Sequence, residues 1–97
     1  MAELRWSKLA ISDLEDIISY ISLDSEENAR LFVTKIIDSV ENTSTFPYSG
    51  RIVPELNDEQ IREKVFQNIR IIYRVKDNIM EVIRVLHSAR DFPEIDK

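Results

Sequence analysis

The sequence predicts an α+β domain in which a helical hairpin packs on one face of a three- to four-stranded antiparallel sheet. Between residues 9 and 40, apolar residues recur at three- and four-residue spacing, the periodicity of amphipathic helices. From residue 61 to residue 87 they alternate instead with polar residues, as in strands that bury one face. The order is therefore strand, helix, helix, strand, strand, strand, and the second face of the sheet is left available for function.

A short strand and two helices are expected in the first half of the chain. Leu4 and Trp6 alternate with charged residues, which indicates a strand of about four residues. Ser7 is a suitable N-cap for a first helix that runs to about residue 22, and Ser25 or Asp24 is suitable for a second. Because only a few residues link the two helices, they must run antiparallel. The apolar stripes consist of Leu9, Ala10, Leu14, Ile17, Ile18 and Ile21 on the first helix and Ala29, Phe32, Val33, Ile36, Ile37 and Val40 on the second.

A loop and three strands are expected in the second half. Residues 42–60 lack periodicity and contain the only glycine, Gly50, and two of the three prolines, so they are predicted to form a loop with turns. The three strands start at Ile61, Ile69 and Ile79, and short polar interruptions between them allow tight hairpins. The tail from Ser88 to Lys97 is predicted to be irregular and partly mobile.

Length and composition limit the classes of protein to consider. The 97 residues suffice for one domain, 1–97, with an ordered core of about 3–92. The chain has no cysteine and one histidine, so disulfides, thiolate chemistry and a structural zinc site are not expected, and neither a metal nor an organic cofactor is implied. No apolar run approaches the ~20 residues of a membrane-spanning helix, and the N-terminus does not resemble a secretory signal. A cytoplasmic protein without a membrane partner is therefore expected.

The net charge of −5 conceals an asymmetry along the chain. Residues 1–61 carry 5 basic and 12 acidic residues, whereas residues 62–90 carry 7 basic and 3 acidic residues. A positive C-terminal half on an acidic protein suits an acidic protein partner or a limited anionic surface. It is poorly suited to a general electrostatic grip on nucleic acid.

Four motifs together resemble the ParE/RelE (plasmid stabilisation) toxin superfamily. The first is the pattern of Trp6, Ala10, Asp13-Leu14, Ile17 and Tyr20-Ile21 ahead of the helical hairpin. The second is the loop Phe46-Pro47-Tyr48-Ser49-Gly50-Arg51 followed by Pro54-Glu55-Leu56. The third is the strand from Ile69 to Val75, and the fourth is the stretch from Val82 to Arg90. The resemblance covers roughly residues 4–92 and implies a RelE-like β-α-α-β-β-β fold.

The resemblance also implies two different activities. In mRNA-cleaving members of the superfamily, the open sheet face carries a general base, a general acid and arginines for the phosphate, as attack by a ribose 2′-hydroxyl requires. Glu55, Arg70 and His87 match the base, phosphate clamp and acid of the YoeB-like branch. The resemblance implies that the fold brings Arg84 and Arg90 to the same open face, with Arg84 as a fourth catalytic candidate. ParE-like members instead poison DNA gyrase and are neutralised by an antitoxin. For that role the expected antitoxin- or target-binding residues are Arg51, Arg70, Arg74, Arg84 and Arg90.

The sequence favours the ParE-like branch. The segment Arg84-Val85-Leu86-His87 resembles the Arg-Val-Leu-His motif of that branch, and Ser88 replaces the aromatic residue that follows the histidine in YoeB-like members. The acidic composition points the same way, because a ribosome-dependent nuclease must approach a highly anionic particle. We therefore expect a type II toxin that inhibits growth through DNA gyrase and forms a hetero-oligomer with its antitoxin. The alternatives are a ribosome-dependent mRNA endonuclease and an inactive interaction module or co-repressor.

Each of these residues also has a plain structural interpretation. Gly50 is expected to be a turn residue with Arg51 beside it on the surface. Tyr73 alternates with apolar residues, so its ring is expected in the core, as is that of Trp6. Arg70 and Arg74 fit strand arginines that are exposed to solvent and bind nothing. His87 fits a structural residue at the end of an apolar strand.

Overall fold

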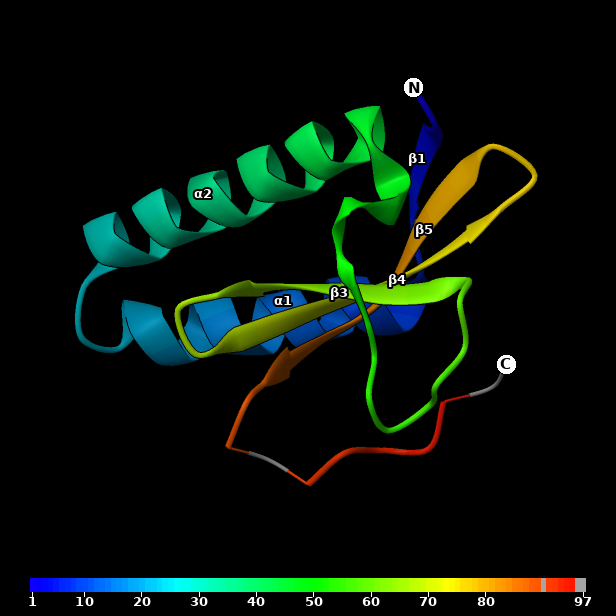
Figure 1. Cartoon of the computed structure of the whole chain (residues 1–97). Helices are drawn as coiled ribbons and strands as arrows, with labels where there is room; N and C mark the ends of the chain where they lie inside the picture. The colour runs from blue at the N-terminus through cyan, green and yellow to red at the C-terminus, as the bar shows by residue number, and fades with distance from the viewer. Residues whose placement is uncertain (90, 96–97) are drawn as a thin grey trace.

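The computed structural model describes residues 1–89 and 91–95, which fold into two helices against one sheet (Figure 1). The elements follow the predicted order, with one short 3₁₀ helix and one short strand added in the loop. They are β1 (Glu3–Trp6), α1 (Lys8–Ser22), α2 (Glu26–Thr45), η1 (Pro47–Ser49), β2 (Arg51–Ile52), β3 (Ile61–Phe66), β4 (Ile69–Lys76) and β5 (Ile79–His87).

The sheet has five strands in the order β1-β5-β4-β3-β2. The α+β class and the helical hairpin are confirmed, but the prediction of three to four antiparallel strands was wrong in two respects. β1 lies parallel to β5, so the sheet is mixed, and β2 adds an edge strand inside the expected loop. Both strands are only four and two residues long, too short for a periodicity that reveals their partners.

Both helices begin where the sequence predicted. The hydroxyl oxygens of Ser7 and Ser25 accept hydrogen bonds from the main-chain N–H groups of Ala10 and Asn28, as N-caps do. α2 runs on to Thr45, past residue 42, where the predicted loop begins. Thr43 and Ser44 in its last turn are buried, and their hydroxyl groups donate to the Ser39 and Glu41 carbonyl oxygens. Neither helix in the described part of the chain is long and apolar enough to cross a membrane.

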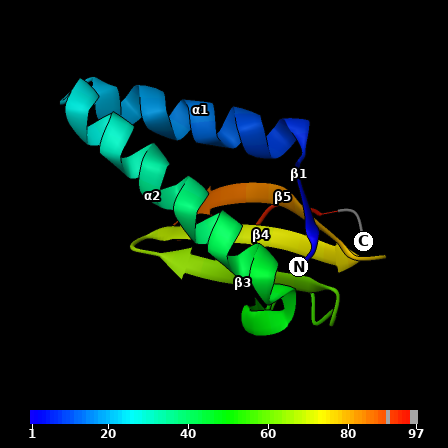
Figure 2. The ribbon, with the colours of Figure 1, turned by 90° about the horizontal axis from the view of Figure 1, so that it is seen from above.

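The main core lies between the helices and the face of the sheet that they cover, the helix-side face (Figure 2). β4 contributes alternate residues to it, and Tyr73 is its largest fully buried side chain. Trp6 packs against this core while remaining half-buried. The buried members are Ala2, Ala10, Leu14, Ile36, Val40, Ile69, Ile71, Tyr73, Val75, Met80, Val82 and Val85.

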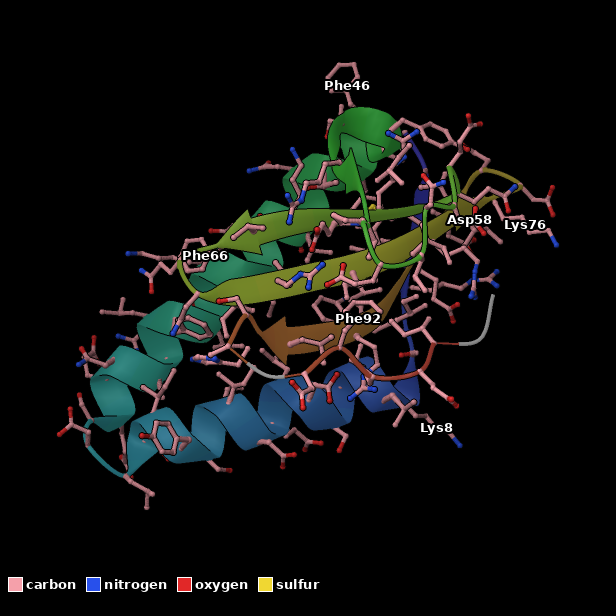
Figure 3. All side chains as sticks on the ribbon, turned by 60° about the horizontal axis from the view of Figure 1, so that its bottom comes forward. Lys8, Phe46, Asp58, Phe66, Lys76 and Phe92 are labelled. Carbon is pink, nitrogen blue, oxygen red and sulfur yellow. The ribbon has the colours of Figure 1, made fainter. Side chains whose placement is uncertain are left out.

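The opposite face of the sheet, the second face, is partly covered rather than open as expected. A smaller apolar cluster forms there from Val53, Ile61, Ile72, Ile83 and Leu86. Leu56 from the loop, and Phe92 and Ile95 from the C-terminal tail, pack against this cluster. Figure 3 shows Phe92 lying across the strands on this side. The described tail is irregular, as predicted, but it contributes to burial of the sheet.

Gly50 is required for space and not for a turn conformation, which corrects the sequence-based interpretation. Its backbone is extended, with φ of −73°, a conformation open to any residue. Its N–H donates a 3.0 Å hydrogen bond to the Tyr73 hydroxyl, which itself donates to the Pro47 carbonyl oxygen at 2.6 Å. A Cβ at Gly50 would lie 2.3 Å from the Tyr73 hydroxyl oxygen and 2.6 Å from the Glu63 carbonyl oxygen. The loop can therefore dock on β4 only without a side chain at this position.

Gly50→Ala should lower the free energy of unfolding by about 1–3 kcal/mol, the usual cost of overpacking a filled interior. Urea denaturation measures the change. Ser49→Ala, one residue earlier and exposed, is the matched control and should change stability by less than about 0.5 kcal/mol. Equal stability of the two variants would contradict the close-approach role of Gly50.

Candidate functional site

Arg70 forms the centre of a charged cluster on the second face of the sheet. It lies on β4 with its side chain only 13% exposed. Its Nη1 and Nη2 donate to the two carboxylate oxygens of Glu55, both at 2.8 Å, and its Nε donates to Glu63 Oε1 at 2.6 Å. The Phe92 ring centroid lies 5.1 Å from its Cζ, within cation–π range. Arg70 thus holds two carboxylates and is covered by an aromatic ring.

Glu63 is the member of the cluster that sequence analysis missed. Its side chain is 0% exposed, and it accepts hydrogen bonds from Nε of Arg51 and from Nε and Nη2 of Arg70. A carboxylate buried to this extent needs such partners, since an unpaired buried charge costs several kcal/mol. One signal was present in the sequence, because Glu63 shares a strand face with Ile61 and Val65.

Glu55 is poorly placed to act as a general base. The hydrogen bonds from Arg70 lower its pKa from 4.5 to about 2. A catalytic base works best with a pKa near the working pH, whereas Glu55 is fully ionised there and its proton affinity is low. The same hydrogen bonds raise the pKa of Arg70 and occupy both of its terminal nitrogens, so neither group is available to substrate without breaking the pair.

Arg84 is engaged at a different place, the edge of β5 beyond the end of β1. Its Nε and Nη2 donate to the two oxygens of Asp13 on α1, at 2.8 and 2.9 Å. Asp13 also accepts from the main-chain N–H of Val85 at 2.9 Å, and it raises the pKa of Arg84. Asp13 therefore provides a hydrogen-bond acceptor to the edge of β5 and orients Arg84.

His87 lies on the opposite face of the sheet from Arg70. It pairs in register with Ile69, whose side chain belongs to the helix-side core, whereas Arg70 pairs with Leu86 on the second face. Its Nε2 lies 2.7 Å from Nδ2 of the Asn68 side chain, and its Nδ1 accepts from the Ala89 N–H at 3.2 Å. The structure therefore joins Glu55 and Arg70 and keeps His87 apart from both.

The remaining arginines of the expected site are dispersed. The Arg51 side chain is 61% exposed while its Nε holds Glu63. Arg74 lies on the second face, 3.8 Å from Glu81. Arg90 lies outside the described residues. Among the described residues, Glu55, Arg70 and Arg51 therefore belong to one cluster around Glu63, whereas Arg84 and His87 lie apart from it.

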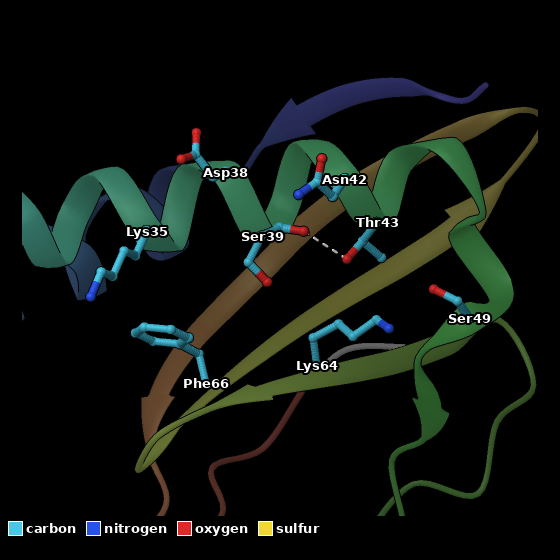
Figure 4. Close-up of a pocket in the computed structure, with 8 residues that line it drawn as sticks. All are labelled: Lys35, Asp38, Ser39, Asn42, Thr43, Ser49, Lys64 and Phe66. Carbon is cyan, nitrogen blue, oxygen red and sulfur yellow. Dashed lines mark hydrogen bonds between the residues drawn. The ribbon is translucent and has the colours of Figure 1, made fainter.

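A polar hollow of about 440 Å³ lies between α2 and β3 (Figure 4). Lys35 and Lys64 line it together with Asp38 and several hydroxyl groups, and the Thr43 hydroxyl donates to the Ser39 carbonyl oxygen at 2.8 Å. It contains none of the expected site residues. Within residues 1–89 and 91–95, no three His, Asp or Glu side chains group in a way that could hold a metal ion.

Residues 4–92 match the model of a protein family described as the ParE toxin of the type II toxin-antitoxin system parDE. Two relatives are similar over nearly their whole length. The chain is 29% identical to a Sinorhizobium fredii protein named as toxin Y4kP, over 95% of this chain and 94% of that protein. It is 28% identical to toxin RelE2 of Caulobacter vibrioides, over 93% of this chain and 99% of that protein.

Two solved structures share the fold. A chain of the chromosomal ParDE TA system from P. aeruginosa superposes with a TM-score of 0.75 at 23% identity, covering 90% of this chain and 96% of that one. The conserved hypothetical protein HP0894 from Helicobacter pylori superposes with a TM-score of 0.50 at 15% identity, covering 88% and 92%.

Removal of the Glu63 carboxylate should destabilise the protein strongly. Glu63→Ala takes a partner from Arg70 in a largely buried position, and breaking a buried ion pair costs about 3–5 kcal/mol. Urea denaturation measures the loss. Glu59→Ala removes an exposed carboxylate nearby and should change stability by less than about 0.5 kcal/mol. A Glu63→Ala loss as small as that of the control would show that the buried pair contributes little.

Acid should weaken the contact between the loop and the sheet. The folded-state pKa of Glu55, about 2, lies below its ordinary value of 4.5, so its contribution to stability is fully present above pH 4.5 and is lost as the pH falls towards 2. Glu55→Gln should therefore flatten the stability profile between those two pH values. Urea denaturation over this range tests the prediction, and identical slopes for variant and wild type would refute it.

Proposed function

The chain belongs to the ParE toxin family of type II toxin–antitoxin systems, and from this we propose that it inhibits growth by acting on DNA gyrase. We also propose that the protein does not cleave messenger RNA and that an antitoxin neutralises it by binding to it.

The observation that carries the proposal is the separation of the candidate nuclease residues. Cleavage through a 2′-hydroxyl requires a base, a phosphate clamp and an acid around one phosphate. Here Glu55 and Arg70 close on each other, and His87 pairs in register with a residue of the opposite face. Binding of a messenger RNA phosphate to Arg70 would require the ion pair between Glu55 and Arg70 to open. Even then, His87 would not be available as a general acid on that face of the sheet.

Gyrase is favoured as the target by the family match and by the chain's own charge. The Arg84-to-His87 segment carries the ParE-like motif, and a net charge of −5 hinders approach to the ribosome. Inhibition of a protein target by binding requires a complementary surface but no general acid or base.

Of the arginines expected to bind antitoxin or target, Arg51 and Arg74 suit the role best. The Arg51 side chain is 61% exposed and that of Arg74 is 26% exposed, whereas Arg70 and Arg84 are 13% and 19% exposed and hold carboxylates in two-pronged contacts. An acidic partner can therefore reach the exposed guanidinium of Arg51 while Nε of that arginine keeps its hydrogen bond to Glu63. Arg70 and Arg84 serve mainly to shape the surface.

Expression of the protein alone should arrest growth, and purified protein should block supercoiling or trap cleaved DNA when it is added to gyrase and plasmid. In a translating extract, codon-specific cuts in ribosome-bound message should be absent. His87→Ala should leave the gyrase effect within about twofold, because this proposal gives the imidazole no proton to transfer. A supercoiling assay and primer extension on message provide the two readouts.

The opposite result would assign a different activity. Cuts in ribosome-bound message that fall by about 10²–10⁴-fold in His87→Ala would identify a general acid and overturn the proposal. Normal growth at high levels of folded, free protein would instead favour an interaction module or co-repressor.

A further inference from the structure

Two aromatic side chains are exposed where α2 ends and η1 begins. Phe46, the C-cap of α2, is 72% exposed, and Tyr48, within η1, is 54% exposed. Figure 3 shows Phe46 projecting outward at the end of α2. Rings exposed to this extent contribute little to the protein's own core, whereas aromatic side chains are enriched at the centres of protein–protein interfaces. The two rings are therefore candidates for contact with a partner.

The main chain that carries these rings is fixed by a buried hydroxyl group. The Tyr73 hydroxyl donates to the Pro47 carbonyl oxygen at 2.6 Å and accepts from the Gly50 N–H at 3.0 Å. Burial raises the pKa of Tyr73, so its hydroxyl keeps the proton that it donates. One side chain of the core thus holds the first residue of η1 and the residue that follows η1. Exposed groups that are already fixed lose less conformational entropy when a partner binds them.

Arg62 of β3 brings a positive charge to the side of Tyr48. Its Cζ lies 5.1 Å from the centroid of the Tyr48 ring, within cation–π range. Its guanidinium donates to the carbonyl oxygens of Glu59, Tyr48 and Gly50, at 2.8, 3.4 and 3.2 Å. These acceptors are uncharged, so the hydrogen bonds orient the guanidinium without neutralising it.

Arg51 adds a second cation immediately after Gly50. Its side chain is 61% exposed while its Nε holds Glu63. Arginine and tyrosine are among the residues that carry most of the binding energy at protein interfaces. We define the η1 surface by Phe46, Tyr48, Arg51 and Arg62. It combines exposed rings with positive charge on a protein whose net charge is −5.

We propose that the η1 surface binds an acidic patch on the protein target of this toxin. The inference rests on the proposed function, which makes DNA gyrase the target, and it names the surface and the chemistry of that contact. Carboxylates on the target pair with the two arginines, and the two rings pack against apolar groups beside them. Direct binding to nucleic acid fits less well, because two arginines on an acidic chain release few counterions.

The test compares how the full-length wild type and its variants inhibit supercoiling of plasmid by gyrase. Phe46→Ala and Tyr48→Ala should each raise the concentration for half-inhibition about tenfold or more, because each removes an exposed ring. Leu23→Ala and Tyr20→Ala remove exposed side chains at the far end of the helical hairpin and should stay within about twofold. Urea denaturation should show that all four variants fold, since all four side chains are exposed.

Two further variants test the charge and the role of Tyr73 as a positioning residue. Arg62→Gln should reduce the salt dependence of binding to gyrase, whereas Arg62→Lys, which keeps the charge, should retain it. Tyr73→Phe keeps the buried ring but removes the hydroxyl that fixes η1, so it should weaken binding about threefold or more. A loss of salt dependence in both Arg62 variants would contradict the role of the charge.

Three results would overturn the assignment, each in a different way. Full inhibition by Phe46→Ala and Tyr48→Ala, beside a wild type that inhibits gyrase, would reject the η1 surface and leave the proposed function intact. Tight binding of the wild type to plasmid alone, lost in these two variants, would assign the surface to nucleic acid instead. A folded wild type without effect on gyrase would refute the proposed target and, with it, this contact.

Discussion

The burial of the Glu63 carboxylate constrains much of the second face of the sheet. A fully buried charge must be paired, and the partners available are Arg70 on the neighbouring strand and Arg51 on the edge strand. The guanidinium group of Arg70 is planar and carries several N–H donors. While Nε holds Glu63, Nη1 and Nη2 donate to the carboxylate of Glu55 in the loop. One buried carboxylate thereby links β2, β3, β4 and the segment after β2.

A second ion pair, between Asp13 of α1 and Arg84 of β5, connects the helical hairpin to the edge of the sheet. Where β1 ends, the edge of β5 needs hydrogen-bond partners, which the N-cap Ser7 and Asp13 of α1 supply. Asp13 then fixes Arg84 in the same contact. Arginines that suggest an anion-binding surface in the sequence are in this way largely consumed by the protein's own acids.

Several residues singled out from the sequence take part in the observed ion pairs, but their arrangement differs from the expected one. Sequence analysis identified Glu55, Arg70, Arg84 and His87, and the contact between Glu55 and Arg70 exists. It missed Glu63, because a carboxylate in an alternating strand pattern usually faces water. It also expected His87 near Arg70, although their strand registers place them on opposite faces. Convergence of side chains depends on register and on loop position, which local periodicity does not specify.

By itself the sequence determined the elements whose cause is local. Ser7 and Ser25 start the helices, and period-two alternation defines β3, β4 and β5 with nearly their true bounds. Only the tertiary structure decided that β1 pairs in parallel with β5 and that Ile83 is left unpaired between the partners of Ile72 and Tyr73. It also decided that Gly50 must be small, because the Tyr73 hydroxyl lies against it. Caps and alternation act over a few residues, whereas these contacts join residues distant in the chain and arise only when the core closes.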